Sequence, residues 1–174
     1  MAAYAFITGS PFVYIDYFAI APQHYGFLFA LNIIGITSLN LINRRLVNRF
    51  ALSRLLLVAS FIATLAAFVG WLWIAVNPQQ ILAIILPIFV VFSTNGIIAA
   101  CANAAALDSV PATIAGSAAA LLGALQYGSG IISSLLLAHF SNGSPQVMMS
   151  IILIFVALAT VMAALSGREN GVVG

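Results

Sequence analysis

The sequence predicts an all-α integral membrane protein with six transmembrane helices. Three observations lead to this prediction: the share of apolar residues, the length of the apolar runs and the one-sided placement of the basic residues. Of the 174 residues, 64% are hydrophobic and only 5% are charged, whereas soluble domains carry about 25% charged residues. A soluble fold cannot bury so much apolar surface, so we expect a lipid bilayer to surround the chain.

Six apolar segments approach or meet the roughly 20 residues that a spanning helix needs. They lack strand-like alternation, and a backbone exposed to lipid must bond to itself, so each is expected to be helical. Pro11 and Pro87 lie inside such segments and predict kinks. We interpret residues 1–174 as a single domain with helices at about 2–21, 25–43, 55–76, 81–107, 112–139 and 147–165.

The five arginines set the orientation of these helices. Four of them, Arg44, Arg45, Arg49 and Arg54, lie between the second and third segments, and Arg168 follows the sixth. With six spans, both places lie on the same side of the membrane. Basic residues gather on the cytoplasmic side of membrane proteins. The chain is therefore expected in the inner (plasma) membrane with both termini in the cytoplasm.

Asparagines mark the second and fourth helices, whereas helices 55–76 and 147–165 carry few polar side chains and are expected to face lipid. Asn32, Asn40 and Asn43 lie on the second helix, and Asn95 and Asn103 on the fourth. Amides deep in a span usually face protein or water. Two interpretations stay open: hydrogen bonds between helices, or a water-filled path.

The fifth helix carries a glycine at every seventh residue: Gly116, Gly123 and Gly130. Small residues on one stripe let two helices approach closely. We expect this stripe to be a helix-packing face, and a smooth face of this kind would also suit a sliding or rocking motion.

Three stretches of the sequence are more specific than its composition. They are Gly9–Ile15; Ala21–Gly26 followed by Phe29–Asn32; and Asn103–Asp108 with Pro111, Ala115–Ala118 and Gln126. They resemble, in this order, helix 7, the passage into helix 8, and the stretch from helix 10 into helix 11 of major facilitator superfamily transporters of the Bcr/CflA drug-resistance branch. The resemblance covers nearly the whole chain.

This resemblance implies that the six helices are helices 7 to 12, one half of a major-facilitator-type fold. It implies proton-coupled antiport of a small drug-like molecule by the complete protein, with no cofactor. Because Met1 falls inside the first helix, we expect a chain truncated at its N-terminus and inactive by itself. Its partner would be the missing N-terminal six-helix half or a second copy.

Two groups of candidate site residues follow from the polar pattern and the resemblance. The substrate or cavity candidates are Asp16, Asn32, Asn40, Asn95, Asn103, Gln126 and Tyr127. The candidates for a cytoplasmic gate are Arg44, Arg45, Arg49 and Asp108. The arginines have a simpler interpretation as a topology signal that also binds anionic headgroups, and Asp108 with Ser109 would simply cap the fifth helix.

Asp16 is the one acid of the first helix. Fourteen residues beyond Ala2, at about 1.5 Å per residue, it would lie in the outer third of the bilayer. It is either an acid placed at a helix end or a group that attracts a cationic substrate or exchanges a proton, and the nearby Pro11 would let this end swing.

Other classes of protein fit poorly. Five arginines and no lysine are too few for a nucleic-acid surface. An intramembrane protease of the rhomboid type has Gly-x-Ser-Gly, but Tyr127 replaces its first glycine, two residues before Ser129. His139 lies about 15 Å further along the same helix, too far to act as its base. Two histidines without a clustered acid or thiolate make no metal site. A channel or a non-transporting membrane scaffold remains the alternative function.

Topology gives the first testable prediction. Alkaline phosphatase, which is active only outside the cytoplasm, is expected to be active when fused after Gln79 and inactive when fused after Leu165, because all arginines would then lie inside. Activity after Leu165 and not after Gln79 would overturn the orientation.

Overall fold

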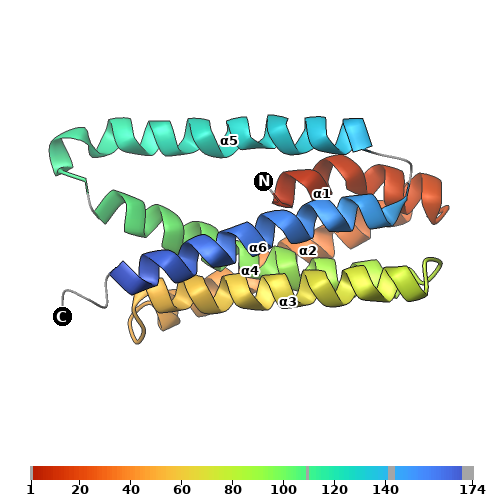
Figure 1. Ribbon diagram of the computed structural model, residues 1–174, viewed down its shortest axis with the longest axis horizontal. Coiled ribbons are helices and arrows are strands. Elements are labelled where there is room, and N and C mark those ends of the chain that lie inside the picture. The colour runs from red at the N-terminus through yellow and green to blue at the C-terminus, as the bar shows by residue number, and fades with distance from the viewer. Residues whose placement is uncertain (1, 109, 141–143, 170–174) are drawn as a thin grey trace.

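The chain forms a bundle of helices in the computed structural model, which describes residues 2–108, 110–140 and 144–169 (Figure 1). No strand occurs among these residues. The elements, in chain order, are α1 (Ala2–Pro11), the π-helix η1 (Phe12–Tyr17), α2 (Pro22–Leu46), α3 (Leu52–Val76), α4 (Leu82–Asp108), the short 3₁₀ helix η2 (Ala112–Ile114), α5 (Ala115–Phe140) and α6 (Pro145–Glu169).

Five helices of the described chain are long and apolar enough to cross a membrane: α2, α3, α4, η2 together with α5, and α6. The chain is therefore a helical, multi-pass membrane protein. The first segment is shorter, with ten residues in α1 and six in η1, or about 24 Å at the α-helical rise against a bilayer core of about 30 Å. The sixth span stays a prediction.

The first segment contains a π-helix where the sequence predicts a kink. Pro11 has no N–H to donate to the carbonyl one turn earlier, so the regular α-helical bonding is interrupted there. The wider turn follows at once, with the N–H of Phe18 donating to the carbonyl of Val13 at 3.1 Å. Ala19 then adopts a positive φ of 52°, and the helix ends before it, at Tyr17 rather than at the expected Ala21.

Other helices begin or end a few residues away from their expected bounds. Pro22 and Pro145, which were expected in connections, are the first residues of α2 and α6, positions where a missing N–H costs nothing. Helix α2 also continues beyond its expected end to Leu46, and α3 begins early, at Leu52. Arg44 and Arg45 therefore lie in the last turn of α2 and Arg54 in the first turn of α3, with Arg49 in the turn between these helices.

Helices α3 and α6, which were expected to face lipid, pack along one another (Figure 1). Two hydrogen bonds join them: Thr64 Oγ1 and Thr160 Oγ1 are 2.8 Å apart, and the indole N–H of Trp71 donates to Ser150 Oγ at 3.0 Å. Large apolar side chains of α3, such as Phe61 at 60% exposure, point outward. These four side chains are thus paired across the contact, whereas the buried hydroxyl of Ser60 on α3 has no partner. The outward side of α3 presents apolar side chains to the lipid.

Close helix packing depends on a stripe of small residues that the sequence analysis does not single out. Ala59, Ala63, Ala67 and Gly70 are all buried along one face of α3, and a Cβ added to Gly70 would lie only 2.7 Å from Pro87 of α4. Small residues at such an interface let backbones approach closely. Helix α4 has buried residues along much of its length and packs against both α3 and α2.

The stability of the α2–α4 contact can be tested at one glycine. Gly35 of α2 is buried, and a Cβ added there would collide with Ser93 Oγ and the ring of Phe89. Gly35→Ala is expected to destabilise the protein by about 1–3 kcal/mol, because overpacking forces helices apart. Unfolding with sodium dodecyl sulphate from a mild detergent measures this loss.

Gly26→Ala is the matched control on the same helix, because nothing lies within 4 Å of a Cβ added at Gly26. It should leave stability unchanged or raise it by up to about 1 kcal/mol. Equal losses from both variants would mean that α2 is not held against α4 at Gly35.

Candidate functional site

The asparagines of α2 and α4 meet in one groove. Its volume is about 540 Å³, and it lies between these two helices. Helix α2 contributes Ile36, Asn40, Asn43 and Arg44, and α4 contributes Asn95, Gly96, Ala99, Ala100 and Asn103. Of the seven cavity candidates from the sequence, the structure brings Asn40, Asn95 and Asn103 together here, with Arg44 from the gate candidates.

Small residues of α4 make room for this groove. The amide of Asn40 lies directly on Gly96, where an added Cβ would be 2.7 Å from Asn40 Oδ1. Ala99 and Ala100 continue the same wall. Asn43 is buried, and its Oδ1 accepts a weak hydrogen bond from the thiol of Cys101 at 4.0 Å. The groove therefore has a closed end at Asn43 and open amides along its length.

Hydrogen bonding distinguishes between the two interpretations of the asparagines. Within the described chain, no hydrogen bond joins the side chains of Asn40, Asn95 and Asn103 to another protein group, and Asn40 and Asn103 are exposed. An amide without any partner is costly in an apolar surrounding. For these three asparagines the geometry favours water or a polar ligand over hydrogen bonds between the helices, whereas Asn43 does accept such a bond from Cys101 of α4.

Asn32 lies apart from the groove. It is buried at 5% exposure, its Nδ2 donates to the carbonyl of Leu28 at 3.0 Å, and its Oδ1 has no partner. The hydroxyl of Ser93 on α4 is also buried and unpaired. Buried polar atoms of this kind are usually satisfied by ordered water, so we expect water to reach this part of the α2–α4 contact.

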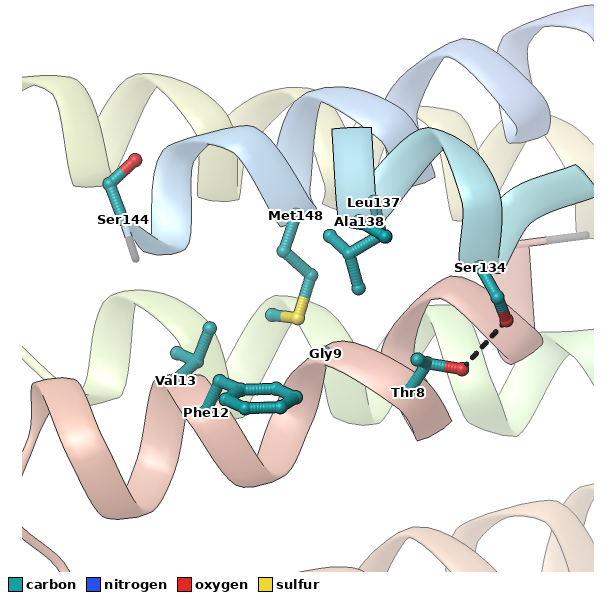
Figure 2. A pocket seen from close by; sticks show the side chains of 9 residues that line it. All are labelled: Thr8, Gly9, Phe12, Val13, Ser134, Leu137, Ala138, Ser144 and Met148. Carbon is teal, nitrogen blue, oxygen red and sulfur yellow. Dashed lines mark hydrogen bonds between the residues drawn. The ribbon is translucent and has the colours of Figure 1, made fainter. Parts of the chain in front are cut away.

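A second pocket lies between α1, η1, α5 and α6, and the sequence analysis does not predict it (Figure 2). Its volume is about 190 Å³. Phe12, Leu137 and Met148 give it apolar walls, and the hydroxyls of Thr8 and Ser134, 3.0 Å apart, close one edge. Gly9 is the one lining residue whose type in the sequence points to close packing here, because a Cβ added to it would lie 2.8 Å from Leu137 Cδ2.

The remaining cavity candidates line neither hollow. Tyr127 on α5 is 74% exposed, with its ring centroid 6.3 Å from that of Tyr4, and Gln126 beside it is also exposed. Asp16 is the next-to-last residue of η1 and is exposed. Because α2 starts near η1 and reaches the groove only at its far end, Asp16 lies at the opposite end of the bundle from Arg44.

The structure separates the gate candidates. Arg44 and Arg45 line a hollow on α2, Arg49 lines a different one, and Asp108 is the exposed last residue of α4. No ion pair joins Asp108 to an arginine in the described part of the chain. Ser109, its partner in the proposed helix cap, lies outside the described residues. A closed gate is therefore absent from this conformation, and the gate remains a prediction.

The three glycines of the α5 stripe differ in their surroundings. Gly130 packs on the ring of Tyr4, with an added Cβ 3.0 Å from ring carbons, whereas a Cβ added to Gly116 or Gly123 would meet nothing within 4 Å. Only the last of the three glycines packs against another helix of this chain.

The hydroxyl of Ser129 bonds within its own helix, and the described residues hold no cluster of metal-binding side chains. Ser129 Oγ donates to the carbonyl of Gln126 at 2.7 Å. No group of three or more His, Cys, Asp or Glu side chains occurs among residues 2–108, 110–140 and 144–169.

Two curated proteins are similar to this chain. One is an uncharacterized MFS-type transporter, YdgK, of Bacillus subtilis (strain 168), 29% identical over 135 residues, which cover 76% of this chain and 32% of that protein. The other is a bicyclomycin resistance protein homolog of Haemophilus influenzae, 28% identical over 140 residues, which cover 78% of this chain and 33% of that protein. No family model and no solved structure matches.

These similarities confirm the resemblance to major facilitator superfamily transporters and to their bicyclomycin-resistance branch. One of these relatives is named as a transporter and the other for drug resistance, in agreement with the expectation that this chain is not an enzyme. The matched part of the chain spans about a third of the length of each relative.

The groove can be tested for water by cysteine labelling. Asn95 and Leu65 are each the fourteenth residue of their helices, α4 and α3. In a background with Cys101→Ala, which removes the single cysteine, Asn95→Cys is expected to react with a membrane-impermeant maleimide on the order of tenfold faster than Leu65→Cys. The reason is that thiols react as thiolates, which form only where water reaches them.

The labelling is measured in membranes by the gain in mass of the purified protein. Similar slow rates at both positions would show that the groove is dry and that the asparagines serve helix packing.

Proposed function

We propose that this chain is one six-helix half of a drug-efflux transporter that exchanges protons for a small drug-like molecule. The observation that carries the proposal is the groove of unpartnered amides in an otherwise apolar bundle. The similarity to a protein named for bicyclomycin resistance supports a drug as the substrate class.

The groove suits recognition of an uncharged or weakly charged polar molecule. Its amides offer both donors and acceptors, Arg44 adds one positive charge at its end, and Ala99 and Ala100 leave apolar surface between the polar groups. Ligand pockets commonly combine apolar walls with a few polar groups that orient the ligand.

A second six-helix body would complete the site. The groove is open on the side away from α2 and α4, and the stretch of α5 that carries Gly116 and Gly123 has free space beside both glycines. Transporters of this general kind alternate access by rocking one half against the other around a site near the midplane. We propose the N-terminal six-helix half of a complete transporter, or a second copy of this chain, as that body.

Expression in a strain without drug-efflux pumps tests this proposal. The chain alone is expected to leave drug sensitivity unchanged, and its co-expression with the N-terminal six-helix half of a similar transporter to give saturable efflux that collapses when the proton gradient is dissipated. Asn40→Leu is expected to lower this efflux by about tenfold or more, because it removes an amide that faces the ligand.

Phe61→Leu, a change on the lipid-facing side of α3, is the control and should leave efflux intact. Proton-dependent efflux by the purified chain alone would show that a second copy of the chain takes the place of the N-terminal half. Unsaturable, voltage-driven currents instead of drug flux would support the channel interpretation.

A further inference from the structure

The hollow beside Arg49 and Arg54 has the composition of a lipid site. Its volume is about 710 Å³, and three segments line it: the turn after α2, the start of α3 and the last turns of α6. Arg49, Ser53 and Arg54 give it a polar end, and Phe50, Leu57, Ala163 and Ala164 give it an apolar wall. Such a division matches a molecule with an anionic head and a hydrocarbon tail.

We infer that this hollow binds an anionic phospholipid, with the phosphate between Arg49 and Arg54 and an acyl chain along the crevice between α3 and α6. The inference is independent of the proposed transport function. It concerns a face of the bundle that does not include the groove between α2 and α4.

Charge complementarity selects an anionic headgroup. Both guanidinium groups are exposed and neither forms an ion pair in the described part of the chain. Basic pockets between helices at the cytoplasmic side of a membrane bind the heads of anionic lipids, and each arginine near the surface contributes about 1 kcal/mol. A zwitterionic headgroup would bring its own positive charge toward the two arginines and bind more weakly.

The start of α3 adds to this attraction. Its first residue follows Ala51, which offers no side chain to cap the helix, so the N–H groups of the first turn remain free for other acceptors. Ser53 supplies a hydroxyl at the same place. The positive end of the helix dipole is an additional, smaller contribution beside the two guanidinium groups.

The apolar part of the hollow exists because α6 has small side chains there. Further along, the α3–α6 contact is closed by the Thr64–Thr160 and Trp71–Ser150 hydrogen bonds. At the arginine end, Ala163 and Ala164 leave the crevice open beside Leu57. This face carries exposed apolar side chains, so a lipid of the surrounding bilayer can enter from the side.

The hollow beside Arg44 and Arg45 provides a contrast. All but one of its lining residues belong to α2, with Asn48 from the following turn. It offers a similar charge without a crevice between two helices, and therefore no place for a tail. These two arginines make a matched control, because their replacement removes the same charge from the same end of the molecule.

Lipid retention by the purified chain tests the inference. The chain is extracted in a neutral detergent, titrated with dioleoyl-phosphatidylglycerol or dioleoyl-phosphatidylcholine, and examined by native mass spectrometry. The phosphatidylglycerol is expected to bind at one saturable site, and the double variant Arg49→Gln/Arg54→Gln to bind it about 30-fold more weakly, from about 1 kcal/mol for each arginine.

The control double variant Arg44→Gln/Arg45→Gln should retain the lipid like the unchanged chain. Ala164→Leu, which fills the crevice and keeps every charge, should also lose the lipid. Tail-free glycerol phosphate should bind the unchanged chain far more weakly than phosphatidylglycerol does, because it lacks the acyl chains. Circular dichroism checks that each variant keeps its helices.

Three results would overturn the inference: equal weakening by both double variants, equal retention of phosphatidylcholine, or full retention by Ala164→Leu. The first would mean a diffuse effect of charge, and the second a site without headgroup selection. The third would place the lipid outside the α3–α6 crevice.

Discussion

The structure depends on one constraint: a polar group inside a bilayer needs a partner. Helices α3 and α6 meet this constraint at four side chains, by bonding Thr64 to Thr160 and Trp71 to Ser150, and among the buried side-chain polar atoms of the described α3 residues only the Ser60 hydroxyl has no partner. Thr94 of α4 meets it by donating to carbonyls of its own helix. The asparagine amides that face the α2–α4 groove do neither, so they require water or a ligand. The α3–α6 side of the bundle therefore suits contact with lipid, and the α2–α4 groove suits contact with water or a polar ligand.

Packing determines where the polar side lies. Helix α3 brings its stripe of small residues against α4, which leaves α4 buried along much of its length. Helix α2 packs mainly on α4 and holds Gly35 against Ser93 at the middle of the contact. At the far end of this pair, α3 covers one side, where its Ala59 packs with Cys101 of α4, and Asn40 and Asn103 are exposed. The groove is therefore a consequence of the position of α2 at the edge of the bundle.

The sequence predicts an all-helical chain and five of its six expected spans, because these depend on a local property, the long apolar runs. It also marks the asparagines that line the groove, but not whether they bond to another helix or face water. Helix bounds were less accurate at Pro22 and Pro145, since a proline is compatible with a connection and with a first helical residue alike. The π-helix after Pro11 and the pocket beside Gly9 depend on contacts between distant segments, such as that of Gly9 with Leu137, and no local pattern contains them. The same holds for the glycine stripe of α5. The spacing of its glycines predicts a smooth helix face, but it does not identify the helix that packs on this face.

The two ends of the bundle differ in how tightly α5 is held. From Tyr127 onward α5 is held by α1: Tyr127 and Gly130 meet Tyr4, and Ser134 meets Thr8. Toward its start, α5 stands away from the other helices (Figure 1), and Gly116 has no neighbour within reach of an added Cβ. This loose end follows α4 directly and is the end at which the groove and the arginines lie. The groove, the arginines and the less tightly packed start of α5 therefore lie at the same end of the bundle, while aromatic and hydroxyl contacts with α1 hold α5 from Tyr127 onward.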